Sequence, residues 1–303
     1  MRTGISVIIP CYNRAGFLRE AIESVLSQEY DGPVEIIVSD DGSTDQSVPI
    51  AESFGTPVTV LRKPAGCASQ GPGPTRNRAI DTSTQPYIAF LDSDDVFMPG
   101  HLERLASLLD EDSKLGFVFD DAEGMTSEGT HRWNWPYPKC NLEKPETVFL
   151  DPFFPTCSVM LRRGVLESVG GSFSEELLMA EDMDLWLRIF ENCSVRHISG
   201  IGSRVREHDG RLISPQNIRT TYHYAKMVLE RAIVRYPYST SVVRQRKAVI
   251  DFRMAQADWL EKKYVRALFQ LLKSGIKDPV RGLTTLAVKC RTLTRKAGLS
   301  RKK

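Results

Sequence analysis

Three features of the sequence predict an α/β fold with a mostly parallel central sheet, flanking helices and a C-terminal helical region. Short apolar runs alternate with amphipathic stretches over the first 110 residues, which is the order of a doubly wound sheet. Polar clusters follow three of these runs, and from about Pro215 onward the periodicity is helical. Ligands of open parallel sheets bind beyond the carboxyl ends of the strands, so the three clusters are expected to converge there.

The expected elements of the first part follow in chain order. Residues 5–10 form an apolar strand, and a helix spans 14–28, because apolar residues recur there at helical spacing and Asn13 can cap it. A second strand is expected at 34–38, which is rich in β-branched residues. The remaining elements are a strand at 58–61, a helix at 75–81, a strand at 87–91 and a helix that begins near Pro99.

The pattern after residue 110 is less regular. Strands are expected at 115–119 and 158–161, and a helix at 180–190, where an acidic start suits the helix dipole. Amphipathic helices are expected at 222–233 and 248–272.

The net charge of +2 conceals a division of the chain. Residues 204–303 contain 24 Lys and Arg against 7 Asp and Glu, a net +17, which leaves 16 against 31, a net −15, for residues 1–203. Such asymmetry indicates contact with membrane or nucleic acid. Three explanations stay open: a solvated charged face, docking against the acidic part, and adhesion to anionic lipid. We expect one domain at 1–212 and a basic, mainly helical region at 213–303.

The cysteines and the apolar runs indicate the cellular compartment of the protein. The six cysteines lie far apart without a Cys-x-x-Cys pair, so neither a zinc site nor a disulfide framework is indicated, and a reducing cytosol is expected. The apolar run at 5–10 is too short for a signal peptide, and no later run approaches a membrane span. The expected protein is cytoplasmic, either soluble or peripheral at the inner face of the membrane.

The segment FLDSDD places three carboxylates, Asp92, Asp94 and Asp95, directly after an apolar strand. Hard divalent cations prefer oxygen ligands, and Mg²⁺ binds through one or two carboxylates together with substrate phosphates. Acidic tetrads are also common in turns and helix caps, where Asp bonds to the nearby backbone. The segment therefore predicts either a nucleotide-dependent metal site or an acidic turn.

Five segments in order resemble the family 2 glycosyltransferases, which are inverting, nucleotide-sugar-dependent enzymes of the GT-A fold. They are SVIIPCYNR, VSDDGSTD, GPTRN, FLDSDD and EDMDLWLR, within residues 4–210. The resemblance implies a nucleotide-sugar half at about 1–110 and an acceptor half at about 111–212. It also implies Mn²⁺ or Mg²⁺, a UDP-sugar donor, and a glycan, polysaccharide or lipid-linked acceptor; no nucleic-acid partner is expected.

The resemblance also implies a donor site. Asp41 would accept a hydrogen bond from the uracil ring, and Arg76 would contact the nucleotide, for which a planar guanidinium is well suited. Tyr12 could pack against the base or merely cover the sheet edge. Asp95 could serve the donor sugar or cap the helix near Pro99. The other nucleotide-sugar-binding positions implied are Pro10, Arg14, Asp92 and Ser93.

Metal binding and catalysis are implied at the remaining motif positions. Asp94 would bind the cation, which would act as a Lewis acid on the leaving diphosphate. Asp92 would contact ribose, donor sugar or metal-bound water. His208 resembles a late histidine that approaches the metal or diphosphate, although a lone histidine is usually structural. Asp182 would be the general base, and Glu181 would position the acceptor or the base, unless the pair is ordinary helix-start charge.

An aromatic loop precedes the acidic pair in the sequence. Trp133 and Trp135 could stack on an acceptor sugar or form a small satellite core, and both readings stay open. Two rival functions remain. A nucleotidyltransferase would need a glycine- and lysine-rich loop near the first strand, which is absent. A non-catalytic nucleotide- or glycan-binding scaffold would not need all the carboxylates.

Overall fold

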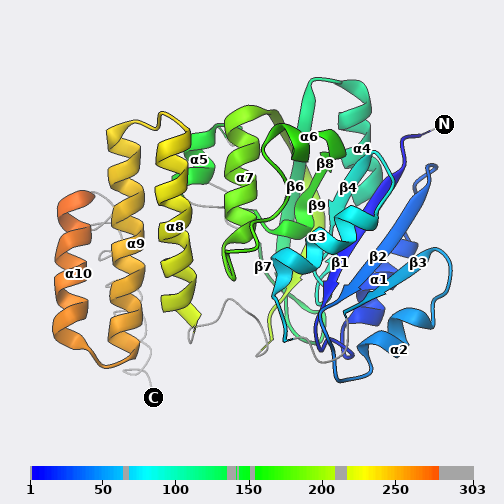
Figure 1. Cartoon of the computed structure of the whole chain (residues 1–303), viewed down its shortest axis with the longest axis horizontal. Coiled ribbons are helices and arrows are strands. Elements are labelled where there is room, and N and C mark those ends of the chain that lie inside the picture. Colours follow the sequence, from blue (N-terminus) through cyan, green and yellow to red (C-terminus); the bar gives the residue numbers. More distant parts are fainter. Residues whose placement is uncertain are drawn as a thin grey trace, which may run out of the picture. The chain divides into compact units, whose positions relative to one another are not determined.

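The computed structural model describes residues 2–63, 68–134, 141, 143–150, 154–208 and 217–279. The chain divides into two compact units, Met1–Arg211 and Leu212–Lys303. The first unit is α/β, and the described part of the second is helical (Figure 1).

The first unit is built on a nine-stranded sheet in the order β3-β2-β1-β4-β8-β6-β9-β5, with β7 paired to β6. Its strands are β1 (Ile5–Cys11), β2 (Val34–Asp40), β3 (Val58–Arg62), β4 (Tyr87–Phe90), β5 (Val96–Phe97), β6 (Leu115–Met125), β7 (His131–Asn134), β8 (Val159–Arg162) and β9 (Ser194–Arg206). Within the described residues, β1, β2, β3, β4, β6 and β9 run in one direction. The prediction of a mostly parallel sheet is confirmed.

Helices and a buried core surround this sheet. The helices of the first unit are α1 (Leu18–Leu26), α2 (Ser47–Glu52), α3 (Pro72–Thr82), α4 (His101–Glu111), α5 (Pro145–Leu150), α6 (Arg163–Ser168) and α7 (Glu181–Asn192), with a 3₁₀ turn at Thr156–Ser158. Every residue of β1 is buried, which explains why the strand is apolar except for Ser6. Helix α1 buries Leu18 and Ile22 in the same core as Leu102 and Leu105 of α4. The central strands therefore hold their carboxyl ends rigidly.

The first helix is shorter than predicted. It begins at Leu18 rather than at residue 14, and Phe17 rather than Asn13 precedes it, without a side-chain cap. Asn13 has a φ of 52°, and its side-chain oxygen accepts a hydrogen bond from the N–H of Thr44 at 2.8 Å. The expected cap is therefore wrong, because the loop after β2 takes up the Asn13 side chain.

The second unit contains α8 (Ile218–Arg235), α9 (Thr240–Leu260) and α10 (Tyr264–Lys277), and α9 packs against both of the others. The single helix expected at 248–272 is wrong, since the chain reverses at 261–263, where Lys262 has a φ of 60°. The sequence predicts no strand at 194–206, where β9 lies, because buried and exposed residues do not alternate regularly along this run. Among the described residues, no helix combines the length and apolar character that a bilayer crossing requires.

Candidate active site

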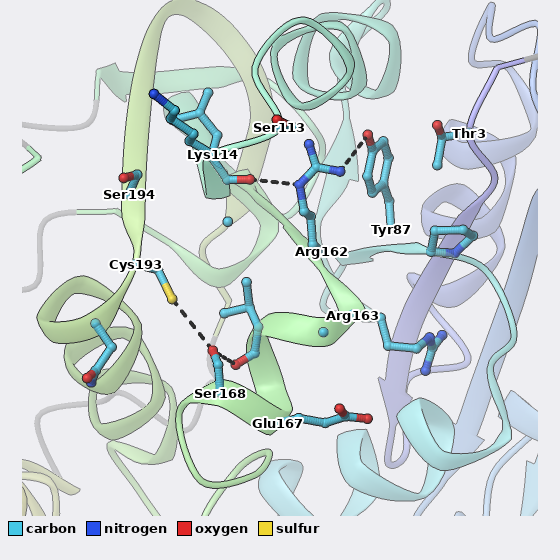
Figure 2. Close-up of a pocket in the computed structure, with 16 residues that line it drawn as sticks. Thr3, Tyr87, Ser113, Lys114, Arg162, Arg163, Glu167, Ser168, Cys193 and Ser194 are labelled. Atoms are coloured by element: carbon cyan, nitrogen blue, oxygen red, sulfur yellow. Dashed lines mark hydrogen bonds between the residues drawn. The ribbon is translucent and has the colours of Figure 1, made fainter.

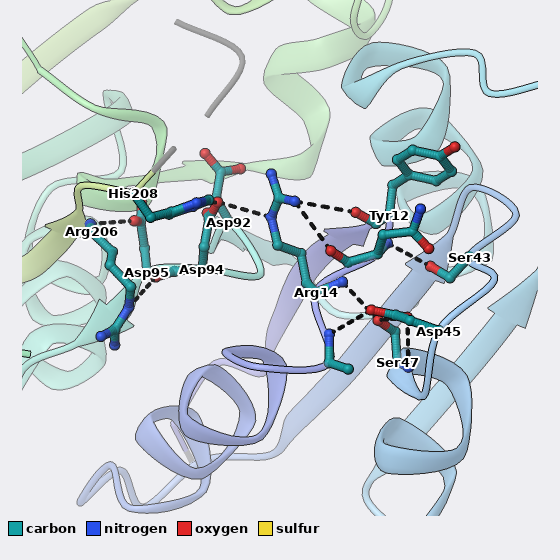
Figure 3. A network of polar contacts seen from close by, with 12 residues as sticks. Tyr12, Arg14, Ser43, Asp45, Ser47, Asp92, Asp94, Asp95, Arg206 and His208 are labelled. Atoms are coloured by element: carbon teal, nitrogen blue, oxygen red, sulfur yellow. Dashed lines mark hydrogen bonds and ion pairs between the residues drawn. The ribbon is translucent and has the colours of Figure 1, made fainter. Parts of the chain in front are cut away.

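The loops after β1, β2 and β4 meet at one edge of the sheet (Figure 3). They meet because β2, β1 and β4 are neighbouring parallel strands. The Asn13 N–H donates to Ser43 Oγ at 2.9 Å, and the Arg14 N–H donates to Ser47 Oγ at 2.8 Å. Arg14 Nε donates to Asp94 Oδ2 at 3.0 Å. The three polar clusters, far apart in the sequence, thus form one site.

Asp94 is the centre of the first half of this site. Its Oδ2 lies 3.0 Å from Arg14 Nε and 2.9 Å from His208 Nε2, so the two side chains for which metal contact is predicted are adjacent. Burial alone would raise the pKa of Asp94, but the hydrogen bond from His208 and the charge of Arg14 outweigh it and hold that pKa below its ordinary value. Asp94 is therefore an ionised carboxylate at neutral pH.

The donor set suits a cation that arrives with its nucleotide. A carboxylate oxygen and an imidazole nitrogen are acceptable ligands for Mn²⁺. In the described part of the chain, no group of three or more His, Cys, Asp or Glu is placed to hold a metal ion. The remaining ligands would have to be phosphate oxygens and water, as is usual for Mg²⁺ sites. Arg14 occupies the same carboxylate oxygen, so it would have to shift toward the incoming diphosphate.

Asp95 faces away from this cluster. It is buried, and its Oδ1 accepts a hydrogen bond from the backbone N–H of Arg206 at 2.9 Å. Helix α4 follows Gly100 and has no side-chain cap, so the capping role left open for Asp95 is wrong, while contact with the donor sugar stays a prediction. Arg206 itself is 2% exposed and donates from Nε to the Asp94 carbonyl at 2.9 Å, and from its guanidinium to Ser127 and Glu20. Asp95 and Arg206 thus fasten the acidic loop to β9.

Arg76 organises the second half of the site. It is 4% exposed, and its guanidinium lies 2.5 Å from Asp92 Oδ1 and 2.8 Å from Glu181 Oε1. Its charge also lies 5.3 Å from the centroid of the Phe173 ring. Burial opposes ionisation, but Asp92 and Glu181 outweigh it and raise the pKa of Arg76. Arg76 therefore links the acidic loop after β4 to the start of α7.

Glu181 and Asp182 begin α7, directly after Ala180, which has a φ of 60°. Burial, followed by the charge of Asp182, raises the pKa of Glu181 to about 7. Burial also raises the pKa of Asp182, although Arg76 opposes the change. Asp182 is the more exposed of the two, and its Oδ2 is 3.4 Å from Thr156 Oγ1. Both carboxyl groups are thus stronger bases than surface acids.

Asp41 is held by donors of its own chain. Its carboxylate accepts hydrogen bonds from Lys63 Nζ at 2.9 Å, from Ser69 Oγ at 2.6 Å and from the N–H groups of Gln70 and Gly71. Burial opposes ionisation, but these bonds outweigh it and lower the pKa of Asp41. A nucleobase could bond to this carboxylate only by replacing one of these donors.

The other predicted positions divide between the interior and the rim. Tyr12 is 46% exposed at the rim of the site, whereas Ser93 is buried and Pro10 lies inside β1. Trp133 on β7 donates from Nε1 to Glu207 Oε1 at 2.9 Å. A side chain at Gly124 would meet the Trp133 ring at 2.3 Å, so the ring packs on β6. Trp135 lies outside the described residues, and the choice between acceptor stacking and a satellite core stays a prediction.

A cavity of about 750 Å³ lies at the opposite edge of the sheet (Figure 2). Residues at the beginnings of β4, β6 and β9 line it, and so do Arg162 and Arg163. Arg162 donates to the carbonyl of Leu115 and to Tyr87 Oη, and Arg163 donates to the carbonyl of Gln85. None of the predicted site residues lines this cavity, and its arginines are bonded to their own chain.

The sequence model of glycosyl transferase family 2 matches residues 6–170, more than half of the chain. The chain belongs to glycosyl transferase family 2. The matched segment includes Arg76 and the three converging loops, of which the acidic loop after β4 is one. Helix α7 and His208 lie beyond it.

Curated relatives show moderate similarity to this chain. An uncharacterized glycosyltransferase of Rickettsia prowazekii is 32% identical over 197 residues, which cover 63% of this chain and 60% of that protein. The succinoglycan biosynthesis protein ExoU of Rhizobium meliloti is 30% identical over 227 residues, covering 67% of this chain and 63% of that protein. This family 2 chain therefore spans less than two thirds of the length of these relatives.

Solved structures identify the fold. TarS 1–349 of S. aureus in complex with UDP-GlcNAc has a TM-score of 0.65 at 21% identity, covering 89% of this chain and 81% of that chain. Mannosyltransferase PcManGT from Pyrobaculum calidifontis in complex with GDP-Man and Mn²⁺ has a TM-score of 0.63 at 17% identity, covering 96% and 81%. The family 2 chain has the predicted GT-A fold.

Proposed function

We propose that this family 2 chain transfers a sugar from a nucleotide sugar, with UDP-sugar as the favoured donor, to a hydroxyl group of a glycan, polysaccharide or lipid-linked acceptor. The observation that carries the proposal is the convergence of two carboxylate clusters at one sheet edge. Asp94 lies beside His208, and Arg76 joins Asp92 to Glu181. One cluster suits a metal-bound diphosphate, and the other suits proton removal from an acceptor.

The donor would lie across the loops after β1, β2 and β4. Tyr12 offers an exposed ring for the base, and Asp41 offers a carboxylate if one of its present donors moves away. Two similar structures carry UDP-GlcNAc and GDP-Man, which supports a nucleotide sugar without selecting the base. Asp92, which is partly exposed, would contact ribose or donor sugar. Arg76 and Asp95, being buried, would position this loop.

A divalent cation, Mn²⁺ or Mg²⁺, would be held by Asp94 and His208. When bound, it would neutralise charge on the leaving diphosphate. Arg14 lies 3.0 Å from Asp94 and could donate to the same phosphate oxygens once it moves from the carboxylate.

Asp182 is our candidate for the general base, and Glu181 for the residue that positions it. Glu181 is buried and paired with Arg76 at 2.8 Å, whereas Asp182 is more exposed. A raised pKa makes Asp182 a better proton acceptor than an ordinary surface aspartate. Attack by the activated hydroxyl on the face opposite the leaving diphosphate would invert the anomeric carbon.

Trp133 is our candidate for contact with the acceptor sugar. Trp133 bonds to Glu207, the neighbour of His208 in the sequence, which supports stacking of an acceptor sugar on this ring. The relative named for succinoglycan biosynthesis supports a polysaccharide acceptor. We also propose that the sugar transfer takes place in the cytoplasm, at the inner face of the cell membrane.

The test is a nucleotide-sugar binding and hydrolysis screen with and without Mn²⁺. We expect one donor to bind only with metal, Asp94→Ala to lose this metal-dependent binding, and Asp182→Asn to bind the donor without turnover. Failure of every nucleotide sugar to bind would overturn the proposal. Binding without turnover of any acceptor by the wild type would instead favour a non-catalytic binding protein.

A further inference from the structure

Helix α10 packs on α9 with its small side chains. Ala267 and Ser274 are buried in this contact, and Ser274 Oγ donates to the carbonyl of Ala248 at 2.8 Å. Helices usually bury their large apolar residues and expose small or polar ones. In α10 this order is reversed, so its apolar face is turned outward.

The outward face of α10 is a continuous apolar stripe. Apart from two adjacent members at 268 and 269, its residues are spaced three or four apart, which places them on one side of the helix. They are Val265, Leu268, Phe269, Leu272 and Ile276, and they are 60–87% exposed. Among the described residues of the second unit, nothing covers this stripe. Exposed patches of this kind mark sites of interaction.

Two amphipathic aromatic residues stand at the beginning of the stripe. Trp259 and Tyr264 are 60% and 52% exposed, and their ring centroids are 5.0 Å apart. Tryptophan and tyrosine are enriched where a protein meets the boundary between lipid and water, because their rings are apolar and their tips are polar.

Basic side chains outnumber acidic ones around the stripe, where Lys263 pairs with Glu261 and Asp278 follows the last turn of α10. Residues 262–277 contain five basic and no acidic side chains. Arg266 and Lys277 pair with Asp258 and Asp251 of α9, whereas Lys273 lies over the ring of Phe269. In the sequence that follows, residues 279–303 add eight Lys and Arg without any acid. A partner for this surface must therefore be both apolar and anionic.

We propose that the outer face of α10 lies in the interface of an anionic lipid bilayer, with the stripe among the acyl chains and the basic residues at the headgroups. A basic amphipathic helix with Leu and Phe on its apolar side has the composition of such elements. A second copy of α10 is a poorer partner, because a symmetric contact would place like charges opposite one another. The inference does not depend on the proposed transfer reaction.

The experiment is co-sedimentation of the full chain with phosphatidylglycerol vesicles and with phosphatidylcholine vesicles, at about 0.1 M and about 1 M salt. We expect binding to the anionic vesicles that salt weakens without abolishing, since the apolar part is not screened. The triple substitution Leu268→Gln, Phe269→Gln and Leu272→Gln should lower the partition coefficient at least about tenfold, because binding scales with buried apolar area.

A matched pair of single variants separates α10 from general surface hydrophobicity. Val265 and Val234, on α10 and α8, are 87% and 88% exposed. Val265→Gln should weaken vesicle binding and Val234→Gln should not. Circular dichroism and hydrolysis of the nucleotide sugar should be unchanged in all variants, which separates this test from that of the transfer reaction.

Three results would overturn the proposal. The wild type could fail to bind anionic vesicles at low salt, or the triple variant could bind as the wild type does. Sedimentation velocity could also show a dimer without lipid that the triple variant abolishes, which would assign the stripe to a second copy.

Discussion

The two carboxylate clusters of the site each contain an arginine, but the pKa of Asp94 is shifted in the opposite direction from those of Glu181 and Asp182. On the metal side, a histidine and an arginine face Asp94 and lower its pKa. On the base side, burial raises the pKa values of Glu181 and Asp182, although Arg76 faces them. The difference teaches that the balance of cationic partners and burial, rather than residue type, divides an acidic site into a permanent anion and a proton acceptor.

The largest expected effect is on the base side. Asp182→Asn keeps the shape of the side chain and removes the proton acceptor, so the rate of sugar transfer should fall by about 10²–10⁴-fold. Donor affinity, measured by calorimetry in the presence of Mn²⁺, should stay within about twofold, because the base does not bind the diphosphate. Glu175→Gln, at an exposed position ahead of α7, is the control and should retain the wild-type rate. An equally active Asp182→Asn enzyme would refute the assignment of the base.

The ion pairs of Arg76 with Glu181 and Asp92 should contribute to the free energy of unfolding. Arg76→Met leaves Glu181 and Asp92 without their cation, and breaking a buried ion pair costs about 3–5 kcal/mol. Chemical denaturation measures this loss in the free energy of unfolding. Adding Glu181→Gln to Arg76→Met should recover part of it, since the buried charge is then removed as well. Additive losses in the double variant would show that the two residues are not coupled.

On the metal side, His208→Ala removes the imidazole beside Asp94. The affinity for Mn²⁺ in the presence of nucleotide should fall by about 10–100-fold, the usual loss for a residue next to a metal ligand or acting as one. Titration of the donor with Mn²⁺ measures the change, and His223→Ala on α8 is the control. If metal affinity is unchanged, His208 serves only to orient Asp94.

The smallest effect is a pH dependence that differs between the two clusters. The raised pKa of Glu181, about 7 against an ordinary 4.5, means that the folded protein holds this proton more tightly than the unfolded chain. The tighter binding of this proton by the folded protein contributes fully to stability below about pH 4.5, and the contribution is lost as the pH rises to about 7. The lowered pKa of Asp94 has the opposite effect. Its ionised carboxylate stabilises the folded protein at neutral pH, and this contribution is lost in acid.

The pH dependence of the transfer rate should be set by the protonation of Glu181 and Asp182. It should rise as the Glu181 and Asp182 pair loses its proton near neutral pH. Arg76→Met should move that rise to higher pH, because Arg76 favours the ionised pair. A pH–rate profile that is flat across neutrality contradicts the proposed role of the pair.

Much of the fold could be predicted because local patterns and burial agree. The apolar runs at β1, β2 and β4 and the acids that follow them are continuous in the sequence, so the sheet and its functional edge were predictable. β9 was missed because its buried and exposed residues do not alternate regularly, and the reversal at Lys262 was missed because the apolar periodicity continues through it.

The sequence by itself determined the α/β order, the family resemblance and the positions of the carboxylates, because each depends on residues that are neighbours in the chain. The tertiary structure alone decided how those carboxylates are paired. Arg76 meets Glu181 105 positions away, and Asp94 meets His208 114 positions away, contacts that no local pattern encodes. It also decided that Asp95 turns toward Arg206 and that α10 exposes its apolar side. In each case, burial and distant charges act only once the chain has folded.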